Sequence, residues 1–157
     1  MTETMIDQPD LRHRALHQVD FRWDGVEVLA YKQEGSAPFL GVTRQVLFDQ
    51  PELASQLRYF EVSPGGHSTL ERHEHVHGVV IVRGCGDALV GTDLFELRQF
   101  DLITVPPMNW HQFRAREDEP LGFLCLVNQD RDRPQLPNEV DLNELRQLPK
   151  VASFIRF

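Results

Sequence analysis

The chain has 157 residues, of which 41% are hydrophobic and 25% charged, and it carries a formal net charge of −8. This length suits one domain with its own core, and the acidic balance disfavours a nucleic-acid partner, because proteins that follow a phosphate backbone need a basic surface. No segment is long and apolar enough to span a bilayer, and no signal-peptide core is visible, so we expect a cytoplasmic protein that binds no membrane. The two cysteines are too few for a disulfide framework and are expected to be free thiols.

Residues 1–25 are expected to form an N-terminal arm with a short helix over Pro9–His17, in which Pro9 occupies the first turn. From Val26 on, short runs rich in β-branched and aromatic residues alternate with Gly, Pro, Asn and Asp, a pattern typical of strands and turns. Turns are predicted at Pro64–Gly66, Gly84–Gly86, Gly91–Asp93 and Pro106–Pro107. The predicted strands are Val26–Tyr31, Thr43–Phe48, Leu57–Val62, Gly78–Val82, Asp87–Val90, Leu94–Leu97, Leu102–Val105, His111–Ala115 and Gly122–Val127.

Many short, closely spaced strands without intervening helices favour an all-β barrel or sandwich over a parallel α/β sheet. We place this barrel at residues 26–128. Beyond Asn128 the chain becomes polar and contains several prolines. The tail of residues 129–157 is expected to carry a short helix over Val140–Leu148 that ends before Pro149 and packs on the barrel.

The segment ERHEHVHG begins at Glu71 and places His73, His75 and His77 at alternate positions. Alternate residues of a strand share one face, so Glu71 and His73 point the same way, and His77 could join them from the next strand after a tight turn. Imidazole is the commonest metal ligand in proteins, and a carboxylate completes a mixed nitrogen and oxygen site. A solvated polar turn is the competing interpretation.

A second histidine, His111, lies in FDLITVPPMNWHQFRA, in which a strand, a Pro-Pro turn and a second strand follow one another. The competing interpretation is a core histidine bonded to the backbone. Two histidine-bearing elements on separate strands, about 34 residues apart, nevertheless match a metal site closed by a β-barrel.

These two elements resemble the two sequence motifs of the cupin family over roughly residues 57–128. The spacing of the first motif is met by Gly66, Glu71, His73, His77 and Gly84, and that of the second by Phe100, Asp101, Pro106, Met108 and His111. The resemblance implies a jelly-roll barrel, also called a double-stranded β-helix. It also implies one divalent metal ion held by Glu71, His73, His77 and His111.

The sequence departs from the family pattern at several positions. Glu71 stands where most cupins have a histidine, and His77 stands where many have glutamate. Phe100 and Met108 replace glycines, which implies slightly different turn geometry. His75 falls at a loop position and is assigned a role in lining the pocket or in catalysis. If the strand ran straight through residue 77, however, His75 would face inward and could replace Glu71 as the fourth ligand. We expect Mn(II) or Fe(II), although Ni(II) and Zn(II) accept the same ligands.

Segments outside the motifs, such as GVEVLAYK, VTRQ and LGFLCLVNQDRDRPQLP, are similar to the methylthioxylulose-5-phosphate methylsulfurylase family of cupins. This resemblance implies an enzyme that cleaves the carbon–sulfur bond of 1-methylthioxylulose 5-phosphate, with glutathione as thiol cosubstrate. The product would be 1-deoxyxylulose 5-phosphate, an isoprenoid precursor made here from salvaged methylthioadenosine. A divalent metal suits this chemistry, because a Lewis acid stabilises the enolate that a thiolate attack on the substrate sulfur would leave.

Two other functions remain open, a metal-dependent dioxygenase of a small enolisable substrate and a non-catalytic small-molecule binder, because fold alone does not fix function. Cys125, in a predicted strand, is either a small buried hydrophobe or a thiol that takes part in catalysis. Arg58, Arg83 and Arg114 are candidates to bind a phosphate, since guanidinium binds it bidentately. A homodimer formed by edge-strand pairing is expected from the family.

Overall fold

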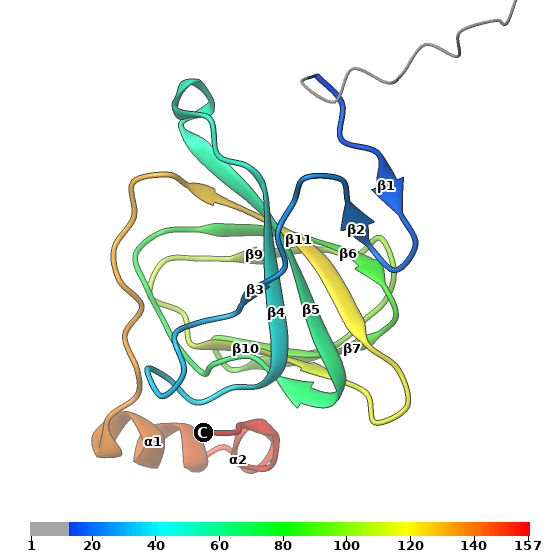
Figure 1. The fold of residues 1–157 in the computed structure, drawn as a ribbon. Helices are drawn as coiled ribbons and strands as arrows, with labels where there is room; N and C mark the ends of the chain where they lie inside the picture. The colour runs from blue at the N-terminus through cyan, green and yellow to red at the C-terminus, as the bar shows by residue number, and fades with distance from the viewer. Residues whose placement is uncertain (1–12) are drawn as a thin grey trace, which may run out of the picture.

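The structure, a computed structural model, describes residues 13–157 and consists mostly of one antiparallel sheet that curls into a barrel (Figure 1). Neighbouring strands follow the order β8-β7-β10-β5-β11-β6-β9, while β4 pairs with β5 and β3 with β4. The strands of this sheet are β3 (Leu29–Ala30), β4 (Leu40–Phe48), β5 (Ser55–His67), β6 (His77–Arg83), β7 (Gly86–Val90), β8 (Asp93–Leu97), β9 (Leu102–Val105), β10 (His111–Ala115) and β11 (Leu121–Asn128).

The predicted all-β fold is confirmed, and every predicted strand overlaps an observed one. The turn predicted at Pro64–Gly66 is wrong, because these residues lie inside β5, which runs on to His67. There the register shifts: Leu40 pairs with His67 while Val42 pairs with Val62. Proline and glycine are tolerated within strands at such irregularities. A long bent β5 therefore contacts β4, β11 and, at its end, β10.

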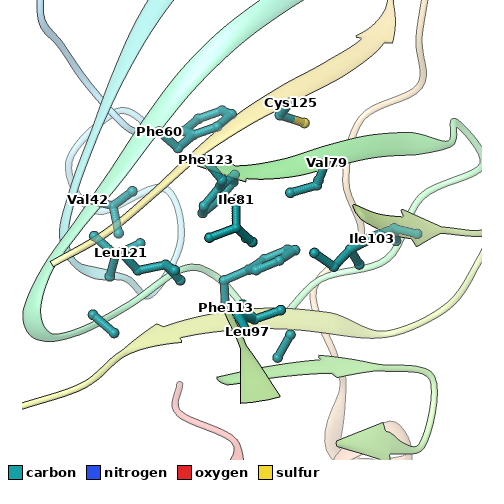
Figure 2. Close-up of a cluster of buried hydrophobic side chains, with 14 of the residues drawn as sticks. Val42, Phe60, Val79, Ile81, Leu97, Ile103, Phe113, Leu121, Phe123 and Cys125 are labelled. Carbon is teal, nitrogen blue, oxygen red and sulfur yellow. The ribbon is translucent and has the colours of Figure 1, made fainter. Parts of the chain in front are cut away.

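The barrel core is built from inward-facing side chains at alternate strand positions, as Figure 2 shows for Phe60, Ile81, Phe113 and Phe123. Phe113 and Phe123 stack with ring centroids 4.7 Å apart. Burying one such side chain contributes roughly 1.5–3 kcal/mol. Phe60, Phe113 and Phe123 of this core also face a cavity inside the barrel, which they line together with polar side chains.

The N-terminal arm contributes a two-stranded sheet of β1 (His17–Gln18) and β2 (Arg22–Trp23) on the outside of the barrel. Phe21 stacks on Tyr59 of β5 at 5.3 Å between ring centroids, and Trp23 meets the same ring edge-on. The helix predicted over Pro9–His17 lies partly outside the described residues. In its described part, residues 13–17 form a turn, irregular chain and the first residue of β1 rather than a helix.

Two short helices, α1 (Glu139–Arg146) and α2 (Pro149–Phe154), pack beneath β7 and β10 (Figure 1). Asn138 caps α1 through a reciprocal capping box with Asp141. The helix predicted over Val140–Leu148 ends two residues earlier than expected, at Arg146. Pro149 starts a second helix, because proline suits the first helical turn. In residues 13–157, no helix is long and apolar enough to cross a membrane.

Candidate metal centre and its cavity

A cavity of about 200 Å³ lies inside the barrel beside the apolar core. Its walls come from β4, β5, β6, β10 and β11, together with the chain after β3, the segment before β6 and the chain that follows β11. The lining residues are Tyr31, Lys32, Val42, Arg44, Arg58, Phe60, Ser68, Glu71, His73, His75, His77, His111, Phe113, Phe123, Cys125, Arg131 and Pro134.

Three histidines converge in this cavity. His77 is the first residue of β6, His111 is the first residue of β10, and His73 lies in the bend between β5 and β6. Each offers one ring nitrogen, and these nitrogens all lie within 4.8 Å of one another. The segment that carries His73 is fixed by a backbone bridge, in which the His111 N–H donates to the Glu71 carbonyl at 3.0 Å. The two histidine-bearing elements, distant in sequence, are thus brought together by direct pairing.

Backbone contacts orient two of the three rings. His73 Nδ1 lies 2.7 Å from the His75 carbonyl oxygen, and His111 Nδ1 lies 3.0 Å from the Asn109 carbonyl oxygen. Because a carbonyl only accepts, each Nδ1 carries the proton, and each Nε2 is left with a free lone pair. Nε2 of His73 is buried and has no hydrogen-bond partner. A buried nitrogen of this kind fits a metal ligand, since unsatisfied buried polar atoms are otherwise costly.

Burial also keeps these imidazoles neutral. Desolvation, assisted by the neighbouring histidines, lowers the pKa of His73 to about 4. Desolvation likewise lowers the pKa of His111 to about 4 and moves the pKa of His77 still further down. Metal binding requires deprotonated ligands. The donor set of the cavity therefore fits a divalent ion of borderline character.

The structure leaves two candidates for a fourth ligand at the cavity wall. Glu71 is 5% exposed, and its carboxylate accepts from the ammonium group of Lys32. His75 stacks on His73 with ring centroids 3.6 Å apart, and its Nε2 lies 3.3 Å from Nε2 of His77. Neither residue belongs to the compact three-histidine group. The sequence proposed Glu71 or His75 as the fourth ligand, and the structure places both residues at the cavity wall.

Asp132, which the sequence analysis did not single out, holds His75 in place. Its carboxylate accepts from His75 Nδ1 at 2.7 Å and from the backbone N–H groups of Glu74 and His75. These contacts raise the acidity of Asp132, and the hydrogen bond from the Glu74 N–H is the main cause of its lowered pKa. The chain after β11 is thereby tied to the histidine segment.

Cys125 of β11 lies directly opposite Arg58 of β5, and its Sγ is 3.4 Å from Arg58 Nη2. The thiol lines the cavity although it is only 1% exposed. Burial raises the pKa of Cys125, while the positive charge of Arg58 acts in the opposite direction. Both cysteines are free, as the sequence predicted.

Of the three arginines proposed from the sequence, only Arg58 lines the cavity. Arg83 pairs with Glu61 at 3.0 Å, and Arg114 donates to the Phe154 carbonyl beside α2. The cavity instead receives Arg44 and Arg131. The sequence could have indicated that Arg44 faces the cavity, because it lies two residues from the inward-facing Val42 in the same strand. Arg131 lies outside any strand and had none.

Comparisons with known proteins agree with this geometry. Residues 58–127 match the cupin domain family model. Over 151 residues the chain is 57% identical to the 1-methylthio-D-xylulose 5-phosphate methylsulfurylase of Rhodospirillum rubrum, covering 96% of this chain and 97% of that protein. A crystal structure of a cupin 2 conserved barrel domain protein from Rhodopseudomonas palustris has a TM-score of 0.87 and 55% identity, covering 92% of this chain and 99% of that one.

A shorter similarity involves the 5-nitrosalicylic acid 1,2-dioxygenase of Bradyrhizobium sp., with 33% identity over 58 residues. It covers 37% of this chain and 28% of that protein. The near full-length relative, the matching domain and the barrel with its histidine group lead to one conclusion. The chain belongs to the cupin family.

Proposed function

We propose that this protein is a metal-dependent enzyme that removes the methylthio group from 1-methylthio-D-xylulose 5-phosphate and releases 1-deoxy-D-xylulose 5-phosphate. The observation that carries this proposal is the 57% identity, over nearly the whole length of both chains, to a methylsulfurylase. The cavity supports it, because neutral histidines, a buried thiol and several cationic side chains line one space. Such a space offers a metal site, a sulfur nucleophile and groups that bind an anion.

His73, His77 and His111 are the proposed core of the metal site, with Glu71 as the fourth ligand. His75 is the competing fourth ligand. When bound, a divalent ion supplies a Lewis acid that stabilises negative charge on a substrate oxygen. Mn(II) or Fe(II) is the proposed metal.

The reaction transfers a methylthio group from carbon to a thiol. The thiol sulfur attacks the methylthio sulfur, a sulfur–sulfur bond forms and the bond to C1 breaks. The electron pair remains on C1 beside the ketone, and C1 takes a proton to become a methyl group. With glutathione as the thiol, the second product is methyl glutathionyl disulfide, so atoms and electrons balance.

Two residues of the chain are proposed to take part directly. The Cys125 sulfur receives the methylthio group first, and glutathione then releases it by thiol–disulfide exchange. The Arg58 guanidinium at 3.4 Å favours the thiolate that this attack needs. His75, whose Nδ1 is held by Asp132, directs Nε2 toward the cavity and holds the proton that moves from the thiol to C1.

An anaerobic assay tests the reaction. Metal-loaded protein, 1-methylthioxylulose 5-phosphate and glutathione should yield 1-deoxyxylulose 5-phosphate and methyl glutathionyl disulfide, both followed by mass spectrometry. Absence of product together with substrate-dependent O₂ uptake would favour the dioxygenase alternative. Inactivity in both assays would favour a binding protein.

The role of Cys125 has its own test. Cys125→Ser should abolish turnover while metal content stays at the wild-type level, because serine has no sulfur to accept the methylthio group. Cys85→Ser is the matched control, since Cys85 bonds to Glu119 away from the cavity. Unchanged turnover in Cys125→Ser would leave Cys125 as core packing and assign the attack to glutathione itself.

The protein is further proposed to be cytoplasmic and to form a homodimer.

A further inference from the structure

Three arginines meet on one wall of the cavity. On the paired strands β4 and β5, Arg44 lies opposite Phe60, and Arg58 lies opposite Val46, so the two arginines are diagonal neighbours on the inner face. Arg131 follows β11 and reaches the same cavity. Its guanidinium is held by the Gln56 side chain at 3.2 Å and by the carbonyls of Asn128 and Gln129.

In the described part of the chain this cluster forms no ion pair, and Asp49 acts on Arg131 only from a longer distance. Among residues 13–157, no carboxylate lies within 4.0 Å of a nitrogen of Arg44, Arg58 or Arg131. Arg58 is 8% exposed, and the Nε atoms of Arg44 and Arg58 are buried without a hydrogen-bond acceptor. Uncompensated charge and unsatisfied donors are costly inside a protein. A bound anion would remove both costs.

The three guanidinium groups also lie close enough to repel one another. Burial first, and the charge of Arg58 second, lower the pKa of Arg44. Burial, then Arg58 and Arg44, lower the pKa of Arg131. The remaining cation of the cavity, Lys32, is already paired with Glu71. The unmatched positive charge is therefore concentrated on the arginine wall.

We propose that Arg44, Arg58 and Arg131 form the subsite for the phosphate group of the substrate. The inference rests on the proposed function for the identity of that substrate. Guanidinium groups suit a phosphate dianion, because their planar array of N–H donors binds its oxygens bidentately. Arg58 is fixed against the Phe60 ring at 4.8 Å and Arg131 by its loop contacts, so the subsite is preorganised.

This subsite fixes the direction of the substrate in the cavity. With the phosphate on the arginines, the C5 end of the sugar is anchored there, and the ketone end extends toward His77 and His111 at the starts of β6 and β10. Arg58 then stands between the phosphate and Cys125. The phosphate should thus contribute mainly to binding and orientation of the reacting end.

Calorimetric titration of metal-loaded protein tests the subsite without any turnover. Wild type should bind D-xylulose 5-phosphate much more tightly than D-xylulose. Arg44→Gln and Arg131→Gln should each weaken binding of the phosphorylated sugar by roughly 10- to 100-fold, as expected for a charge-assisted hydrogen bond, and leave binding of xylulose unchanged. Arg98→Gln is the matched control, because the Arg98 side chain is 79% exposed and lies outside the cavity.

Metal content and melting temperature establish that each variant is folded. If Arg44→Gln does not fold, Arg44→Lys replaces it and should still lose affinity, because lysine keeps the charge and loses the bidentate array. Equal affinity of wild type for both sugars, or retained phosphate preference in the arginine variants, would overturn the subsite. A raised KM for glutathione with an intact preference for xylulose 5-phosphate would also overturn it, since the arginines would then bind the carboxylates of glutathione.

The same data separate this proposal from the proposed function. Loss of phosphate preference in the variants supports the subsite even if wild type fails to cleave the carbon–sulfur bond. Cleavage by a wild type that binds both sugars equally would support the reaction and overturn the subsite. Each proposal can therefore fail alone.

Discussion

Hydrogen bonds at Nδ1 decide which ring nitrogen of His73, His75 and His111 is left free to act as a ligand. The carbonyls of His75 and Asn109 accept hydrogen bonds from Nδ1 of His73 and His111, so Nε2 of each ring keeps a free lone pair. Asp132 imposes the same arrangement on His75. The protein thus prepares ring nitrogens as acceptors before any ion arrives, which reduces the reorganisation that binding requires.

Removal of two histidines tests the metal site. The double variant His77→Ala, His111→Ala should retain no metal after dialysis. Loss of a residue that hydrogen-bonds to a ligand lowers metal affinity by roughly 10- to 100-fold, and loss of a direct ligand lowers it further. Metal content by plasma mass spectrometry is the measurement. His67→Ala is the control, since that histidine lies outside the cavity lining. Full occupancy of the double variant would remove these residues from the site.

The fourth ligand requires a paired comparison. We expect Glu71→Ala to lose metal affinity and His75→Ala to keep it, because the carboxylate of Glu71 lies on a segment bridged to His111. Affinity for Mn(II) in each variant, from competition with a chelating dye, is the measurement. The reverse sensitivity would make His75 the ligand and leave Glu71 as the partner of Lys32.

The sequence could predict the histidines because they lie in two short segments with a family spacing. It could not predict Lys32 beside Glu71 or Asp132 beside His75, since these contacts span 39 and 57 residues. Arg131 illustrates the same limit, because a loop after the last strand carries no periodicity. Residues supplied by long-range packing of irregular chain are thus visible only in the folded molecule.

At the scale of elements, two turns keep a backbone conformation that favours glycine although they hold other residues. Phe100 and Met108 have φ angles of 73° and 57°. Because glycine is missing at both positions, the sequence predicted a slightly different turn geometry. Both residues nevertheless have a backbone conformation in the left-handed region. Gly84 of the first motif, by contrast, is required, because a Cβ there would collide with the Pro120 carbonyl oxygen.

The turn at Phe100 gives a stability prediction. Left-handed backbone costs a residue with a Cβ about 1–2 kcal/mol, and glycine costs about 0.5–1 kcal/mol in chain entropy, so Phe100→Gly should gain somewhat under about 1 kcal/mol. Phe100 is 73% exposed, so little packing is lost. The melting temperature should rise by about 2–3 °C by calorimetry. Phe100→Ala keeps the Cβ and should show no gain; an equal gain would attribute the effect to loss of the phenyl ring.

At the scale of the whole molecule, part of the barrel interior is lined by polar and charged side chains. Beside the aromatic and aliphatic core, the cavity holds His73 with an unsatisfied nitrogen and three arginines that form no ion pair within residues 13–157. The three-histidine group joins β6, β10 and the bend before β6, so an ion bound there would crosslink parts of the barrel that are distant in sequence.

Stability of the whole barrel should therefore depend on metal. A ligand that binds only the folded state stabilises it by about 2.7 kcal/mol when its concentration is 100 times Kd. For a chain of this size that corresponds to a rise in melting temperature of roughly 5–10 °C. Excess chelator should lower the melting temperature of the wild type by this amount in scanning calorimetry. It should leave the His77→Ala, His111→Ala variant unchanged, because that protein has no ion to lose. A chelator-insensitive wild type with proven metal content would show that the ion binds without stabilising the barrel.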